Sequence, residues 1–367
     1  MSKPLTAVGL MSGTSLDGID VALLVTDGET VTSRGPAMTV SYDDTQRSLL
    51  KHGLADAVGM TDRKARPGIL SQIERHSTGW HAEAVQKFCK RFDVSLGGVD
   101  VIGFHGQTVI HRPDIGLTVQ IGDGEELSRL CGVPVVYDMR AIDMLHGGQG
   151  APLVPVYHRA LVADMADRPV AIVNIGGVAN VTWVGADDTL VAFDTGPGNA
   201  LLDDWMKTHT GISRDEGGCM GLVGTVDEAT VAQFLGDGFF ERFLPKSLDR
   251  DSFSGVSLDG LSVADGAATL VAVTTRSIAG SASLMDEPPK AWIICGGGRH
   301  NRAMMRGLEN LLGNVHAAEH HGLDGDAVEA EAWAFLAVRS LRGLPLTYPG
   351  TTGVREPVTG GVIVGKP

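Results

Sequence analysis

The chain has 367 residues, 43% of them hydrophobic, and a formal net charge of −14. This length exceeds what one hydrophobic core usually supports, so we expect two domains. The acidic balance argues against binding to a nucleic-acid backbone, which needs a basic face. Four cysteines without a C-x-x-C pair speak against a disulfide framework and a zinc site. With neither a signal peptide nor an apolar run of about 18 residues, we expect a cytoplasmic protein without a membrane segment.

The first half of the chain alternates strands with helices. A glycine-rich loop at 12–20 joins the first two strands, and Asp43 or Asp44 is a plausible N-cap for the first helix. Apolar periodicity predicts strands at 6–10, 21–25, 37–40, 99–104 and 134–137, and helices at 43–54, 69–92 and 127–131.

The second half repeats this beginning, because the strand–glycine loop–strand pattern of 6–25 returns at 171–184. The pattern predicts an α/β fold of two related lobes, with mixed sheets flanked by helices. We expect the N-terminal lobe at 1–153 and the C-terminal lobe at 154–367, with the final segment packing back on the first lobe. Further strands are predicted at 190–193 and 291–294, and helices at 200–208, 227–235, 263–285, 300–312 and 327–342.

Four glycine-rich loops follow apolar strands, at 12–20, 174–180, 194–199 and 295–298. Glycine lets the backbone approach a ligand closely, so that N–H groups converge on phosphate oxygens. Such loops in both halves indicate a nucleotide held between two lobes, although neither a P-loop nor a Rossmann fingerprint is present. The alternative for each loop is structural: local Ser, Thr and Asp turns, a tight turn stiffened by Pro197, or a glycine-rich helix entry.

An aspartate, Asp143, precedes the glycine-rich turn His146–Pro152 near the proposed lobe boundary. An aspartate in this position is suited to act as a general base. The alternative is a surface ion pair between Arg140 and Asp138, with Asp143 as a helix cap.

A polar cluster of His105, Gln107, His111 and Arg112 follows the strand at 99–104. Parallel α/β sheets bind ligands at this end of their strands. A zinc site on the two histidines is a poor alternative, since no third ligand has a sensible spacing.

Taken together, these motifs resemble the anhydro-N-acetylmuramic acid kinases. The resemblance runs in order from residue 8 to residue 364. The matching segments are Gly9–Asp20, His105–Pro113, Gln120–Asp123, Gly147–Leu153, Asn174–Asn180, Asp194–Asn199 and Cys295–Asn301.

The resemblance implies an actin/hexokinase-like (ribonuclease H-like) fold with an interlobe cleft. It also implies ATP and Mg²⁺ as cosubstrates, a homodimer, and hydrolytic opening of a 1,6-anhydro sugar coupled to phosphorylation of O6 in peptidoglycan recycling. The family's catalytic aspartate falls on Asp143, which would deprotonate the attacking water. Three segments depart from the family pattern. Met144-Leu145-His146 is bulkier, which affects the sugar pocket. Lys246–Asp251 stands where a Thr-Gly is expected after Lys-Ser, and Tyr348–Val354 is less rich in alanine.

Site residues follow from the loops and the resemblance, and no metal ligand is assigned. For the sugar we expect contacts from His105, Gln107, Thr108 and Glu329. The alternatives are a kinase for another 1,6-anhydro sugar such as levoglucosan, or an actin-like ATPase switch. The residues expected to bind ATP are Gly13, Thr14, Ser15, Leu16, Asp17, Gly18, Ile19, Asp20, Gly176, Gly177, Asn180, Asp194, Thr195, Gly196, Gly198, Asn199, Gly296, Gly297, Gly298 and Asn301.

Overall fold

The computed structural model describes residues 2–13, 15–248, 253 and 256–365. The chain divides into two compact units: unit 1 is Met1–Ala163 with Ala327–Pro367, and unit 2 is Asp164–Asp326. This division differs from the one expected after residue 153. Residues 154–163 belong to unit 1, where Tyr157 donates a hydrogen bond of 2.7 Å to Glu331. Residues 327–367 also lie with unit 1.

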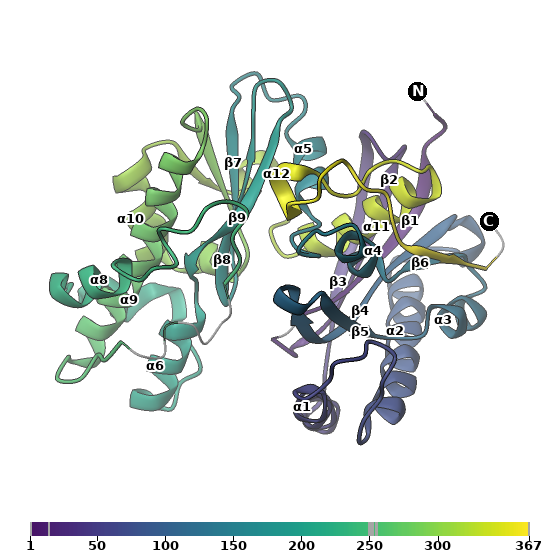
Figure 1. Ribbon diagram of the computed structural model, residues 1–367, viewed down its shortest axis with the longest axis horizontal. Helices are drawn as coiled ribbons and strands as arrows, with labels where there is room; N and C mark the ends of the chain where they lie inside the picture. The colour runs from purple at the N-terminus through teal and green to yellow at the C-terminus, as the bar shows by residue number, and fades with distance from the viewer. Residues whose placement is uncertain (1, 14, 249–252, 254–255, 366–367) are drawn as a thin grey trace. The chain divides into compact units, whose positions relative to one another are not determined.

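The sheet of unit 1 has the strand order β12-β6-β4-β1-β2-β3, with β5 paired to the second half of β4 (Figure 1). The first three strands form an antiparallel meander, whereas β4 runs parallel to both β1 and β6. At the edge, β12 is antiparallel to β6. The strands are β1 (Leu5–Ser12), β2 (Gly18–Thr26), β3 (Val31–Ser41), β4 (Val101–Arg112), β5 (Leu117–Ile121), β6 (Val135–Tyr137) and β12 (Val362–Val364).

Unit 2 repeats this arrangement in the order β11-β10-β7-β8-β9. Again the first three strands are an antiparallel meander and the next two are parallel to the first. Two copies of this ribonuclease H-like order make an actin/hexokinase-like fold, so the predicted fold class is confirmed. The strands are β7 (Val170–Ile175), β8 (Val178–Val184), β9 (Leu190–Pro197), β10 (Ala291–Cys295) and β11 (Val315–Ala317).

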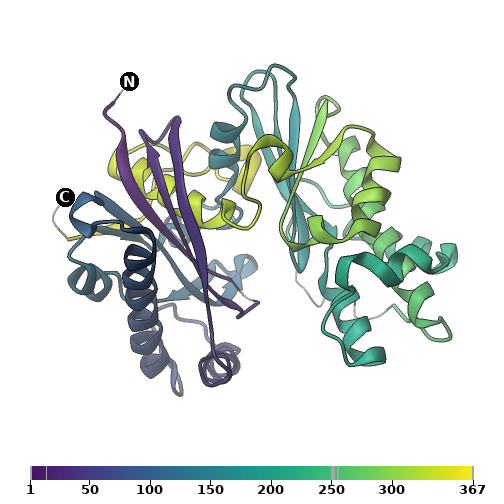
Figure 2. The ribbon, with the colours of Figure 1, turned by 180° about the vertical axis from the view of Figure 1, so that it is seen from behind.

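Helices cover both faces of the sheet in unit 1. Because successive strand residues point to opposite faces, Val8 packs in the core with Phe88 of α2, which Figure 2 shows along one face. Gly9 faces the other side, where a β-carbon would lie 1.8 Å from the carbonyl oxygen of Ala330 on α11. At Gly103 on β4, a β-carbon would lie 2.0 Å from the carbonyl oxygen of Trp333 on α11. Glycine at these two positions therefore allows α11 to pack directly on the sheet.

The helix ends follow local capping signals. The Asp43 side chain accepts from the Gln46 N–H while the Gln46 side chain accepts from the Asp43 N–H, so the predicted cap is confirmed as a capping box. Among the described residues, no helix is long and apolar enough to cross a membrane. Unit 1 contains α1 (Asp44–Ala57), α2 (Leu70–Phe92), α3 (Gly124–Cys131), α4 (Met139–Leu145), α5 (Pro155–Leu161), α11 (Val328–Leu341) and α12 (Pro349–Thr352). Unit 2 contains α6 (Ala200–Thr210), α7 (Cys219–Val223), α8 (Glu228–Leu235), α9 (Val263–Gly280) and α10 (Arg302–Leu312).

Candidate active site

The carboxylate of Asp143 is buried in unit 1: the residue lies inside α4 and is 2% exposed. Its Oδ2 accepts a hydrogen bond of 2.6 Å from the backbone N–H of Gly150. Its Oδ1 accepts one of 2.7 Å from the hydroxyl of Thr352. The interpretation of Asp143 as a helix cap is therefore wrong. A carboxylate has about four lone-pair positions, so two donors orient it while leaving acceptor capacity for a further proton donor.

The glycines after α4 allow the chain to wrap around this carboxylate. A β-carbon at Gly148 would lie 2.2 Å from Oδ2 of Asp143, and one at Gly150 would lie 2.8 Å from the Met144 side chain. Gly150 also has a φ of +73°, which favours glycine. Leu145, part of the bulky departure from the family pattern, is 77% exposed. Its bulk therefore points to solvent rather than toward the buried carboxylate.

Arg140, one turn before Asp143, does not pair with Asp138. Its Nε donates to Nε2 of His105 at 3.2 Å, and its Nη1 donates to the carbonyl oxygen of Gly150 at 3.0 Å. Burial lowers the pKa of the Arg140 guanidinium to about 10, although the charges of Glu329 and Asp143 act in the opposite direction. Arg140 thus brings the aspartate, the glycine turn and His105 into one cluster.

His105 is a neutral member of this cluster. Its Nε2 accepts from Arg140, so its proton lies on Nδ1, which donates to the carbonyl oxygen of Ser12 at 3.1 Å. Burial, together with the positive charge of Arg140, holds the pKa of His105 well below its ordinary value. The ring centroid lies 4.6 Å from that of Trp333 on α11, the helix that also carries Glu329. Of the four residues expected to contact sugar, His105 bonds to Arg140, and Glu329 is near enough for its charge to act on that guanidinium.

Gln107 and Thr108 continue β4 beyond His105. Gln107 is fully buried, and its Oε1 accepts from the Ser12 hydroxyl at 2.6 Å while its Nε2 donates to the Gly13 carbonyl oxygen at 3.2 Å. The Ser12 hydroxyl also lies 2.8 Å from that of Tyr42, and burial raises the pKa of Tyr42 to about 12. Gln107 thus fixes the start of the first glycine loop. Thr108 lies at the cluster's edge, where its hydroxyl accepts from Gln120 at 3.2 Å.

The first glycine loop makes local contacts of its own. The Ser15 hydroxyl donates to Oδ1 of Asp17 at 2.7 Å, a short-range turn like the one weighed as the structural alternative. Leu16 has a φ of +56° and is buried. Gly18, Ile19 and Asp20 already belong to β2, where Asp20 accepts from Thr39 at 2.5 Å. Thr14 lies outside the described residues.

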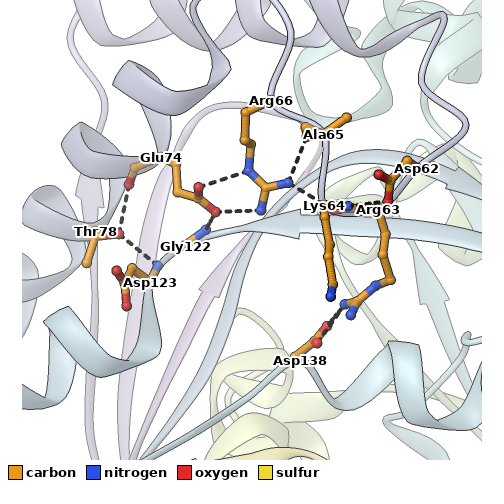
Figure 3. Close-up of polar contacts among 10 residues, drawn as sticks. All are labelled: Asp62, Arg63, Lys64, Ala65, Arg66, Glu74, Thr78, Gly122, Asp123 and Asp138. Carbon is orange, nitrogen blue, oxygen red and sulfur yellow. Dashed lines mark hydrogen bonds and ion pairs between the residues drawn. The ribbon is translucent and has the colours of Figure 1, made fainter.

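Asp138, at the start of α4, forms an ion pair of 2.6 Å with Arg63 from the segment between α1 and α2 (Figure 3). Sequence reasoning missed this pair. The same segment carries Arg66, which forms two hydrogen bonds of 2.8 and 2.9 Å with Glu74 on α2. Glu74 also accepts from the N–H of Gly122 at 3.2 Å. These contacts connect the segment with the start of the helix that carries Asp143.

In unit 2, the structure brings three predicted glycine loops together at the end of β7. The N–H of Gly198 donates to the carbonyl oxygen of Gly177 at 3.0 Å, and that of Asn199 to the carbonyl oxygen of Gly176 at 2.7 Å. A β-carbon at Gly198 would lie 2.2 Å from the Gly176 carbonyl oxygen.

The loop at 295–298 also packs closely against the end of β7. β-Carbons at Gly296 and Gly298 would lie 2.2 Å from Oδ1 of Asn174 and 2.4 Å from Cγ2 of Ile175, respectively. Gly297 is also near, since its β-carbon would lie 3.7 Å from Nδ2 of Asn199. Glycine is thus required where these loops pack on one another, and glycine-rich backbone of this kind is typical of anion-binding sites.

Other predicted ATP-binding residues have visible structural roles. Asn301 accepts from the N–H groups of Ala303 and Met304 and so caps α10. The Thr195 hydroxyl donates to the carbonyl oxygen of Ala179 at 3.1 Å. Asn180 pairs with Asp194 across β8 and β9. A β-carbon at Gly196 would lie 2.6 Å from Oγ of Ser277 on α9.

Asp194 is the carboxylate among these loops. Its Oδ2 accepts from the N–H of Leu248 at 2.7 Å. Burial raises its pKa to about 7, and the bond from Leu248 opposes that shift.

Within residues 2–13, 15–248, 253 and 256–365, no group of three His, Cys, Asp or Glu side chains is arranged to hold a metal.

The duplicated ribonuclease H-like strand order defines the class of the protein as actin/hexokinase-like. The family model described as "Anhydro-N-acetylmuramic acid kinase" matches residues 5–366. The chain belongs to this family, and it is accordingly a kinase.

Relatives extend over the whole chain. The anhydro-N-acetylmuramic acid kinase of Agrobacterium fabrum (strain C58) is 52% identical, covering 99% of this chain and 100% of its own length. That of Rhizobium etli is 53% identical over 98% of both chains. Among solved structures, component A of (R)-2-hydroxyglutaryl-CoA dehydratase from Acidaminococcus fermentans aligns with a TM-score of 0.48 at 11% identity, covering 92% of this chain and 99% of that one.

Proposed function

We propose that this protein opens the 1,6-anhydro ring of 1,6-anhydro-N-acetylmuramic acid with water and phosphorylates O6 with ATP. The products are N-acetylmuramic acid 6-phosphate and ADP, which places the reaction in peptidoglycan recycling. Family membership and relatives above 50% identity support the substrate. The observation that carries the chemistry is the buried carboxylate of Asp143, held by two hydrogen-bond donors.

In the proposed reaction, Asp143 accepts a proton from a water molecule whose oxygen bonds to C1 of the sugar. The C1–O6 bond breaks and its electron pair stays on O6. O6 then attacks the γ-phosphorus of ATP, the bond to the bridging oxygen breaks, and ADP leaves. The proton on Asp143 is finally released to solvent. Water, anhydro sugar and ATP thus give sugar phosphate, ADP and one proton.

The cluster around Arg140 supports a sugar site in unit 1. His105 and Glu329 lie beside this guanidinium, and Thr108 lies at the cluster's edge, so we assign these three side chains to sugar contacts. Gln107 would act indirectly, by fixing the backbone at Gly13. Hydrogen-bonding groups with fixed orientations are what a polyhydroxylated ligand requires.

For ATP, we assign the phosphates to the backbone of the glycine loops, which lie together in unit 2 at Gly176, Gly198 and Gly296. Bound with ATP, Mg²⁺ would neutralise charge on the transferring phosphoryl group. This ion typically uses phosphates, waters and one or two carboxylates, so Asp194, which lies among the loops of unit 2, fits it. A homodimer and a cytoplasmic location belong to the same proposal.

The test is an assay of the purified protein with ATP and Mg²⁺ in H₂¹⁸O. With anhydro-N-acetylmuramic acid, we expect ¹⁸O at C1 of the product and none in its phosphate. Authentic product incubated in the same water gives the spontaneous exchange at C1, which is subtracted. Levoglucosan, which lacks the lactyl ether and the acetamido group, should give a much lower kcat/KM. Hydrolysis of ATP that is independent of sugar, with label in free phosphate, would instead indicate an ATPase.

A further inference from the structure

We infer that Thr352 is a positioning residue that orients the Asp143 carboxylate for proton transfer; this inference rests on the proposed function. Thr352 is fully buried, and its hydroxyl lies 2.7 Å from Oδ1 of Asp143. Because an ionised carboxylate only accepts, the hydroxyl must donate. Such a charge-assisted hydrogen bond is stronger than one between neutral groups.

Two donors from separate segments fix the plane of the carboxylate. The Gly150 N–H holds Oδ2 at 2.6 Å from the glycine turn, and Thr352 holds Oδ1 from the C-terminal segment. With Gly150 alone, the carboxylate keeps rotational freedom, since the terminal torsion of aspartate is broad. With both donors in place, the carboxylate plane is fixed, and so are the directions of the lone pairs that remain on its two oxygens. Thr352 therefore contributes the orientation that a general base needs.

Thr352 is itself held rigidly. Its carbonyl oxygen accepts from the N–H of Gln149 at 2.8 Å, so the residue contacts the glycine turn as well as the aspartate. At the other end of α12, the Tyr348 hydroxyl accepts from Arg159 at 3.0 Å and from Arg339 at 3.1 Å. The Arg339 side chain also donates to the carbonyl oxygen of Pro345 at 2.6 Å. These bonds anchor the segment that presents the hydroxyl.

The neighbouring Thr351 provides a matched control. Its hydroxyl donates to the Tyr348 carbonyl oxygen at 3.0 Å and accepts from the Tyr348 N–H at the same distance. It is buried like Thr352, but in these contacts it bonds only to Tyr348, the N-cap residue of α12. Removing the Thr351 hydroxyl should thus affect the stability of the segment, whereas removing the Thr352 hydroxyl should affect the chemistry.

The experiment compares T352V, T352S and T351V in steady-state kinetics and thermal unfolding. T352V keeps the shape but loses the donor, so we expect kcat to fall about 10- to 100-fold while the KM values for sugar and ATP stay unchanged. T352S keeps the donor and should retain most of kcat. T351V should lower the unfolding temperature and leave kcat near that of the wild type.

A second comparison uses D143N as background. If Thr352 acts through Asp143, adding T352V to D143N should not lower the residual rate further. A T352V enzyme with unchanged kcat, an equal loss in T352S, or additive losses in the double variant would each overturn the positioning role. Should T352V not fold, T352C carries the same prediction, because a thiol is a weak donor. A fully active D143N would instead overturn the proposed function itself.

Discussion

Units 1 and 2 share one strand order, yet they present different chemical groups near the ends of their strands. In unit 1, Arg140 donates a hydrogen bond to His105, and the buried Asp143 carboxylate acts on the Arg140 guanidinium through its charge. In unit 2, the corresponding region is built largely from glycine-rich backbone, with β-carbons at Gly198 and Gly296 excluded by neighbouring loops, and Asp194 is the carboxylate among these loops. The same sheet therefore supports a side-chain site suited to proton transfer and a backbone site suited to phosphate.

Changing Gly198 to alanine should break the backbone site. Its β-carbon would lie 2.2 Å from the Gly176 carbonyl oxygen, so the two loops must separate. We expect kcat/KM for ATP to fall about 100-fold, because moving the phosphate-binding backbone by about 1 Å typically costs about that factor in rate. Gly280→Ala is the matched control, because a β-carbon there meets nothing within 4 Å. Equal ATP affinity in both variants would contradict the assignment.

Gly103→Ala should damage unit 1 through packing rather than chemistry. A β-carbon there would lie 2.0 Å from the Trp333 carbonyl oxygen, forcing α11 away from the sheet. We expect the free energy of unfolding to fall by about 1–3 kcal/mol in urea titrations. Gly79→Ala, inside α2 with nothing within 4 Å, should instead stabilise by about 0.5–1 kcal/mol. Similar changes in both variants would show that the close approach of α11 is unimportant.

Asp194 should give unit 2 a pH dependence of stability. Its pKa rises from 3.8 in the reference state to about 7 on folding. Between these values the folded protein holds a proton that the unfolded chain has released, so stability falls as pH rises through the window. D194N removes this titration and keeps an acceptor for Leu248. We therefore expect the unfolding free energy of the wild type, minus that of D194N, to be lower at about pH 8 than at about pH 5. A difference independent of pH would argue against the burial of this carboxyl.

The smallest effect is expected at the ion pair between Arg63 and Asp138. Both side chains are partly exposed, at 43% and 18%, so solvent screens their attraction. We expect R63A to lower the unfolding free energy by less than about 1 kcal/mol, with an effect that shrinks in high salt. A large loss of kcat in R63A would show instead that this contact positions α4 for the reaction.

The sequence was sufficient to predict the fold because its signals are local. The repeated strand–glycine loop–strand pattern at 6–25 and 171–184 predicted two related sheets, and both have the same strand order. Apolar periodicity found the long helices, although the one predicted at 263–285 ends at Gly280 and continues as a 3₁₀ turn over Ser281–Leu284. Periodicity does not register such a change of helix type.

The contacts within the candidate site were not predictable in the same way. Thr352 lies 209 positions from Asp143, and Arg63 lies 75 positions from Asp138, so only the folded topology brings them together. The tail at Tyr348–Val354 stood out as a departure from the family pattern, but nothing local assigns a hydroxyl in it to a carboxylate. The glycines of the turn were visible in the sequence. The reason for glycine at position 148 follows only from the fold, because a β-carbon there would lie 2.2 Å from Oδ2 of Asp143.

The most direct test of the contrast between the units is D143N, measured for both turnover and ATP binding, with exposed Asp286→Asn as control. Removing a general base should lower sugar-dependent kcat by about 10²- to 10⁴-fold. The Kd of ATP should stay at the wild-type value, because the nucleotide is assigned to the backbone loops of unit 2. A D143N enzyme with normal turnover, or one that loses ATP binding together with turnover, would contradict this account.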